Sequence, residues 1–143
     1  MRDIQPPLLI CDTGPLVAVL NENDADHLAC VELFDSFQGT LVVPSLVVAE
    51  VAYLAQTQVN PNTESRFMDS IANGELKVID LTEDDWVRVA ELVRQYKNFP
   101  LGATDAAVIA LAERFKQQSI ASLDTRHMLA VRPRHCAGLT LLP

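Results

Sequence analysis

The chain has 143 residues and a mass of 15.7 kDa, with 49% hydrophobic and 21% charged residues. This composition excludes a disordered, collagen-like or low-complexity chain, and the length is that of one ordinary domain, 1–143. The formal net charge of −8 excludes a protein that coats nucleic acid through bulk positive charge, although residues 113–143 are basic overall.

The sequence shows no secretory or membrane signal. The first apolar run is interrupted by Asp12, and no stretch approaches the ~20 apolar residues that a membrane span requires. The three cysteines show no CxxC spacing and cannot all pair with one another. We therefore expect free thiols in the reducing cytoplasm and no association with a membrane.

Short apolar runs alternate with helical patterns along the chain. Buried strands are expected at 8–11, 41–43, 76–79 and 120–123, with a last short strand within 138–142. Helices are expected at 12–20, 24–37, 46–56, 63–72, 82–96 and 105–116. This alternation predicts an α/β fold, a three-layer sandwich with a central, mostly parallel sheet of four to five strands.

Acidic residues directly follow two of the predicted strands. Asp12 comes after the strand at 8–11, and Asp124 comes after the strand at 120–123. Open parallel sheets bind ligands outside the carboxyl ends of their strands, which makes both aspartates candidates for a functional site. Either one could instead cap the helix that follows it, and its position alone does not separate the two roles.

Two further carboxylates lie within predicted helices. Asp105 falls in a first turn, where an acidic residue is common because it interacts favourably with the helix dipole. Glu50 is the only charge in the segment 46–54, and its neighbours at i±3 and i±4 are largely apolar. We expect Glu50 to be buried, which costs several kcal/mol without a partner; an edge position that reaches water is the alternative.

Convergence of these four carboxylates would require compensation. Two like charges ~4 Å apart repel by ~4 kcal/mol at an effective dielectric constant near 20. Several such pairs would rival the whole stability of a domain, ~5–15 kcal/mol, unless some carboxylates are protonated or a cation lies between them. Oxygen ligands suit Mg²⁺ or Mn²⁺ better than zinc, and a carboxylate site of this kind supports phosphoryl transfer. Motifs for a serine nucleophile, a P-loop or a dinucleotide are absent.

Four segments resemble the PIN domain, and more narrowly the VapC-type toxins of bacterial toxin–antitoxin pairs. They are 12–18 (DTGPLVA), 48–51 (VAEV), 101–110 (LGATDAAVIA) and 120–127 (IASLDTRH). The resemblance implies a Mg²⁺-dependent endoribonuclease, with Mn²⁺ as a substitute, that hydrolyses phosphodiester bonds in tRNA or rRNA and inhibits translation. It also implies a homodimer and a cognate VapB-type antitoxin that holds the enzyme inactive.

The resemblance assigns roles to individual residues. The catalytic residues would be Asp12, Glu50, Asp105 and Asp124. Three of them, Asp12, Asp105 and Asp124, would hold the metal, and Glu50 would be a further ligand or would orient the attacking water. Thr13 and Ser122 would support the metal site. An ordinary strand serine is the alternative for Ser122.

The basic C-terminal part of the chain holds the candidates for contact with RNA. They are Arg126, Arg132 and Arg134, whose guanidinium groups can each form two hydrogen bonds to a phosphate. Solvated surface arginines are the alternative. His127 and His135 lie in the same region, and the sequence assigns a catalytic role to neither.

Other classes of protein share part of this pattern. A receiver-like phosphorylation module also gathers aspartates at strand ends, but no lysine follows the strand at 120–123. A haloacid-dehalogenase phosphatase would carry Asp-x-Asp where this chain has Asp12-Thr13-Gly14. The remaining alternative is a catalytically silent PIN-fold module for protein interaction, and the four acidic residues argue against it.

Overall fold

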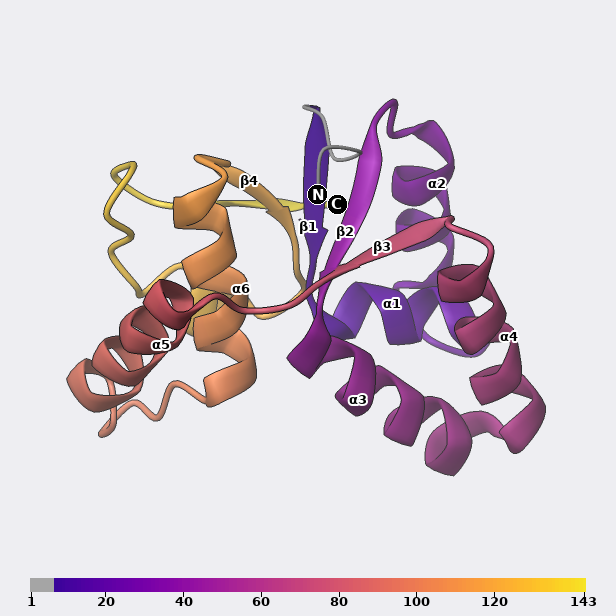
Figure 1. The fold of residues 1–143 in the computed structure, drawn as a ribbon. Helices are drawn as coiled ribbons and strands as arrows, with labels where there is room; N and C mark the ends of the chain where they lie inside the picture. Colours follow the sequence, from indigo (N-terminus) through magenta and orange to yellow (C-terminus); the bar gives the residue numbers. More distant parts are fainter. Residues whose placement is uncertain (1–6) are drawn as a thin grey trace.

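The computed structural model describes residues 7–143, which form a five-stranded sheet flanked by helices (Figure 1). The strands are β1 (Leu8–Cys11), β2 (Thr40–Pro44), β3 (Leu76–Ile79), β4 (Ser119–Ala121) and β5 (Thr140–Leu142). All neighbouring strands are parallel, in the order β3-β2-β1-β4-β5. The predicted α/β architecture is confirmed, and the sheet is wholly parallel.

Helices connect successive strands and cover the sheet. They are α1 (Thr13–Leu20), α2 (His27–Ser36), α3 (Ser45–Leu54), α4 (Pro61–Ala72), α5 (Glu83–Gln95), α6 (Ala103–Arg114) and α7 (Thr125–Met128). Figure 1 shows α5 and α6 on one side of β1 and β2, with α1, α2 and α4 on the other. Within residues 7–143, no helix combines the length and the apolar character that crossing a membrane requires.

Helix α6 has the longest run of buried residues among the helices of the described chain. Seven consecutive residues, 106–112, are buried, which means that the helix is covered all round. Alanines make up much of this stretch, so the backbone of α6 can approach both β1 and α5 closely. Asp105 lies in the N-terminal turn of α6, directly before this buried stretch.

Several boundaries differ by a few residues from those predicted, and three of the differences change the local structure. The helix expected from residue 24 begins at His27, because the Asp24 carboxylate accepts a hydrogen bond from the Asp26 N–H and forms a turn. The helix expected to end at residue 56 continues as a π-helical turn, Ala55–Val59. Strand β4 ends at Ala121, so residues 122–124 leave the strand before α7 begins.

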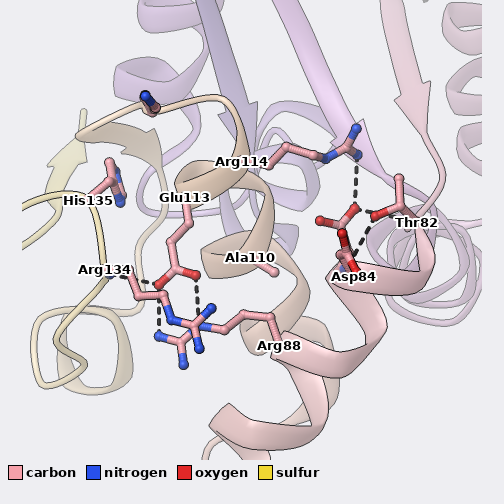
Figure 2. Close-up of a pocket in the computed structure, with 10 residues that line it drawn as sticks. Thr82, Asp84, Arg88, Ala110, Glu113, Arg114, Arg134 and His135 are labelled. Carbon is pink, nitrogen blue, oxygen red and sulfur yellow. Dashed lines mark hydrogen bonds and ion pairs between the residues drawn. The ribbon is translucent and has the colours of Figure 1, made fainter.

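Ion pairs join α5 to α6 and to the C-terminal segment (Figure 2). The Arg88 guanidinium donates two hydrogen bonds, of 2.8 and 2.9 Å, to the two Glu113 carboxylate oxygens, and both side chains are about 10% exposed. Glu113 also accepts a hydrogen bond of 2.9 Å from the Arg134 N–H. Burial alone would raise the pKa of Glu113, but these donors outweigh burial and lower it.

The Arg88–Glu113 pair yields a prediction about stability. Arg88→Met leaves the Glu113 carboxylate buried without its guanidinium, so we expect the free energy of unfolding to fall by about 2–3 kcal/mol. Urea unfolding followed by circular dichroism measures this loss. The double variant Arg88→Met/Glu113→Leu removes both charges and should recover part of it. A double variant that is less stable than Arg88→Met would contradict this explanation.

Candidate active site

The four predicted carboxylates come together in one hollow at the carboxyl ends of β1 and β4. The hollow has a volume of about 300 Å³, and its lining residues are Asp12, Thr13, Gly14, Glu50, Asp105, Leu123 and Asp124. None of these residues is a lysine or an arginine. The charge of the lining is therefore entirely negative.

Asp12 caps a helix and also faces the hollow. It directly follows β1, is only 5% exposed, and accepts a hydrogen bond of 2.8 Å from the Thr13 N–H at the start of α1. Its other carboxylate oxygen accepts a hydrogen bond of 2.8 Å from the Ser122 hydroxyl. The two roles considered for Asp12 are thus compatible, because each uses a different oxygen.

Ser122 connects two of the aspartates. Its side chain is buried, and its hydroxyl donates to Asp12 while accepting a hydrogen bond of 3.1 Å from the Asp124 N–H. The Ser122 N–H also donates to the Leu142 carbonyl, which anchors the segment after β4 to β5. Ser122 therefore fixes the ends of β1 and β4 relative to each other.

Glu50 reaches the hollow from α3, and the expectation that it is buried is wrong. Val47 and Val51 take the buried face of α3, which leaves Glu50 exposed. The alternative considered for this residue, an edge position that reaches water, is the one observed. Glu50 nonetheless lines the hollow together with the three aspartates.

Asp124 caps the short helix α7 and contacts a histidine that the sequence left without a role. Its carboxylate accepts a hydrogen bond of 3.0 Å from the His127 N–H. The His127 ring Nδ1 lies 3.1 and 3.0 Å from the two oxygens of the same carboxylate. Ligand atoms of Asp105, Asp124 and His127 all lie within 4.8 Å of one another. In the sequence, the signal for this contact was the i, i+3 spacing of His127 from an aspartate that can cap a helix.

Burial and mutual repulsion perturb the aspartates. Burial raises the pKa of Asp12; hydrogen bonds from Ser122 and Thr13 oppose this rise, and the charges of Asp124 and Glu50 add to it. Burial, followed by repulsion from Asp12 and Asp124, raises the pKa of Asp105 to about 6. Both pKa values rise first through burial and further through the negative charge of the neighbouring carboxylates, which no lysine or arginine in the lining offsets.

The lining fits a divalent cation that prefers oxygen ligands. Besides the four carboxylates, the hydroxyl oxygen of Thr13 is buried and has no hydrogen-bond partner among the described residues. Hard cations such as Mg²⁺ and Mn²⁺ take carboxylate and other oxygen ligands, whereas zinc sites are typically built from cysteine and histidine. A cation here would offset the excess negative charge.

The three candidate arginines lie in different places. Arg126 is on α7, and its guanidinium carbon lies 5.5 Å from the centre of the Phe99 ring. The Arg132 N–H donates to the Tyr96 hydroxyl. Arg134 lines a separate hollow of about 670 Å³ near the C-terminal end of α6 (Figure 2), and it forms an ion pair of 2.8 Å with Glu91.

Comparison with known proteins assigns the family. Residues 9–132 match the model of the PIN domain. The chain belongs to the PIN-domain family. The ribonuclease VapC26 of Mycobacterium tuberculosis is 33% identical to this PIN-domain protein over 135 residues, which cover 94% of this chain and 100% of that relative. The resemblance to VapC-type proteins is therefore confirmed.

Two solved structures share the fold of this PIN-domain protein. The sarcin–ricin loop cleaving toxin VapC20 of Mycobacterium tuberculosis superposes with a TM-score of 0.76 at 18% identity, over 81% of this chain and 89% of that one. VapBC2 from Rickettsia felis, bound to a DNA fragment from their promoter, gives a TM-score of 0.64 at 17% identity, over 95% of this chain and 99% of that one.

The repulsion in the hollow yields a prediction for the metal-free PIN-domain protein. The pKa of Asp105 is raised to about 6 in the folded protein, so its contribution favours folding at low pH and is lost as the pH rises through about 6. Asp105→Asn removes this charge. We expect the variant, in EDTA, to melt several degrees above the wild type at about pH 7.5.

The pH dependence separates this effect from a general gain in stability. The difference in melting temperature between variant and wild type should shrink as the pH is lowered toward about 5.5, where wild-type Asp105 takes up its proton. Thermal unfolding followed by circular dichroism measures both proteins. A variant that melts below the wild type at both pH values would show that burial and repulsion do not disfavour the charge on Asp105.

Proposed function

We propose that the chain, acting over residues 1–143 as a single PIN domain, is a metal-dependent endoribonuclease and the toxin of a toxin–antitoxin pair. The observation that carries this proposal is the hollow whose charged lining residues are all acidic, in which four carboxylates lie together and no lysine or arginine lines the site. The near full-length similarity to the ribonuclease VapC26 supports the choice of RNA as the substrate.

Asp12, Asp105 and Asp124 would hold the metal, Mg²⁺ with Mn²⁺ as a substitute. Such a cation lowers the pKa of a water molecule and neutralises the negative charge that develops on phosphate oxygens. Ser122 keeps Asp12 in place through its 2.8 Å hydrogen bond, and the Thr13 hydroxyl adds a further oxygen to the lining. These contacts preorganise the ligands.

Glu50 is suited to act on water because its carboxylate is exposed at the edge of the hollow. We assign it the role of orienting the water that attacks the phosphorus in line. The 3′ oxygen of the substrate then leaves and takes up a proton from solvent to become a hydroxyl, and the other fragment carries the 5′ phosphate. The proton of the attacking water passes to the Glu50 carboxylate or to solvent.

Contact with the RNA backbone falls mainly to Arg126. It lies on α7, two residues from Asp124, and takes no part in the ion pairs found within residues 7–143. Arg132 is exposed and is a second candidate, whereas the charge of Arg134 is already paired with Glu91. Because few unpaired arginine side chains are available to contact phosphates, RNA binding depends strongly on neutralisation of the negative charge in the hollow.

The proposed partners are RNA, a cognate VapB-type antitoxin and a second copy of the chain. The fold shared with VapBC2 from Rickettsia felis supports the toxin–antitoxin assignment. We place the activity in the cytoplasm, where cellular RNA is present and where the free thiols of Cys11, Cys30 and Cys136 remain reduced. A catalytically silent PIN module is the second candidate, but it has no need of four repelling carboxylates.

Removal of one ligand charge tests the site. Asp12→Asn preserves the shape of the side chain and should lower the rate of RNA cleavage at least ~100-fold, because the site loses a buried ligand charge. Cleavage of total RNA measures the rate, and circular dichroism checks the fold. Asp69→Asn, which changes an exposed acid on α4, is the matched control and should cleave like the wild type.

The same variants test the toxin assignment in cells. Expression of the wild type and of Asp69→Asn without antitoxin should arrest growth, whereas Asp12→Asn should not. Folded Asp12→Asn that cleaves at the wild-type rate would refute the role of Asp12. Normal growth with soluble, nuclease-active wild type would refute only the toxin assignment.

Metal binding separates an enzyme from a silent module. Isothermal titration of Mn²⁺ into the wild-type protein should give saturable binding, and EDTA should abolish cleavage until excess Mg²⁺ or Mn²⁺ is added. Asp105→Asn should bind Mn²⁺ more weakly, since it lacks a ligand charge. The silent module predicts no heat of binding, and cleavage that persists in EDTA would indicate a metal-free mechanism.

A further inference from the structure

We propose that His127 is a positioning residue of the acidic hollow, which acts by holding the Asp124 carboxylate in the orientation that binds the metal. This proposal rests on the proposed function, because it concerns the same site. Neither the sequence motifs nor the family match assigns a role to His127.

The hydrogen bonds that Asp124 accepts are the first evidence for this role of His127. The His127 ring Nδ1 lies within hydrogen-bond distance of both carboxylate oxygens of Asp124, at 3.1 and 3.0 Å, and the His127 N–H donates to one of them at 3.0 Å. An ionised carboxylate only accepts hydrogen bonds, so Nδ1 carries the hydrogen in this contact. The same ring nitrogen is therefore not free to ligate a metal.

The ring of His127 is itself held in place. It is 20% exposed and packs against the Phe99 ring, with the ring centres 4.9 Å apart and the planes at 65°. The Arg126 guanidinium lies over the same Phe99 ring and donates to the Phe99 carbonyl at 3.4 Å. Phe99 belongs to the loop that leads into α6, the helix that carries Asp105. Packing on the Phe99 ring therefore connects this loop to α7, the helix that Asp124 caps.

The two ends of the hollow are built in the same way. Asp12 accepts hydrogen bonds from the Thr13 backbone N–H and the Ser122 hydroxyl. Asp124 accepts hydrogen bonds from the backbone N–H and the ring Nδ1 of His127. No hydrogen bond to the Asp105 carboxylate contributes to its pKa. Two of the three proposed ligands are thus fixed before a cation binds, and only Asp105 remains free to adjust.

A pair of substitutions tests the donor. His127→Ala removes the ring, whereas His127→Asn keeps an N–H donor at nearly the position of Nδ1 and removes the rest of the imidazole. Partners of metal ligands typically contribute a factor of ~10–100 to metal affinity. We expect His127→Ala to weaken Mn²⁺ binding in isothermal titration by about 10–100-fold, and His127→Asn to recover most of this loss.

Two further readouts distinguish positioning from a merely structural role. Cleavage by His127→Ala should approach the wild-type rate at saturating Mn²⁺, with the deficit appearing as a higher metal concentration for half-maximal rate. Phe99→Leu keeps His127 but removes the ring against which it packs, so it should weaken Mn²⁺ binding by a smaller factor. His27→Ala, whose ring contacts the Ala18 carbonyl, is the control and should bind Mn²⁺ like the wild type.

Each alternative outcome has a definite meaning. Wild-type Mn²⁺ affinity in folded His127→Ala would overturn the proposal. Mn²⁺ binding by His127→Asn that is as weak as that of His127→Ala would also overturn it, because the imidazole itself would then be a metal ligand. If His127→Ala does not fold, His127→Asn and Phe99→Leu decide the matter on the same measurements. Failure of the wild type to bind Mn²⁺ would instead refute the proposed function.

Discussion

Repulsion among four carboxylates in one hollow of about 300 Å³ is the constraint on which the rest of this structure depends. No lysine or arginine lines the hollow, so the fold holds these groups together against their charge. Burial, together with this repulsion, raises the pKa values of Asp12 and Asp105. Sites that store unfavourable energy persist when the surrounding structure is stable enough to hold them, and the buried middle of α6 and the parallel sheet supply that stability here.

The order of the strands brings distant parts of the chain to the site. Because β1 lies between β2 and β4, the residues that follow β1 and β4 emerge next to each other at one edge of the sheet. The hydrogen bond between Ser122 and Asp12 joins positions 110 residues apart. Helix α6 packs against β1 and adds Asp105 to the same edge, which explains why a parallel sheet with buried crossover helices concentrates its polar chemistry there.

The sequence predicted those parts of the site that depend on local pattern. Unbroken apolar runs located β1 and β4, and hence Asp12 and Asp124 at their ends. The exposure of Glu50 was not predictable, because α3 is apolar on several sides. Only tertiary packing determines that Val47 and Val51 enter the core while Tyr53 stays 65% exposed. The contact of His127 with Phe99, and the pairing of Arg134 with Glu91, join residues far apart in sequence and follow from tertiary structure alone.

The same repulsion determines the order in which ligands bind at the proposed site. A phosphodiester that entered the metal-free hollow would add a negative charge to four carboxylates, and no lysine or arginine lines the hollow. The net charge of −8 opposes its approach as well. Binding of RNA must therefore follow or accompany neutralisation of the hollow. If Ser122 through Asp12 and His127 through Asp124 tighten metal binding as proposed, they also control substrate affinity without contacting the RNA.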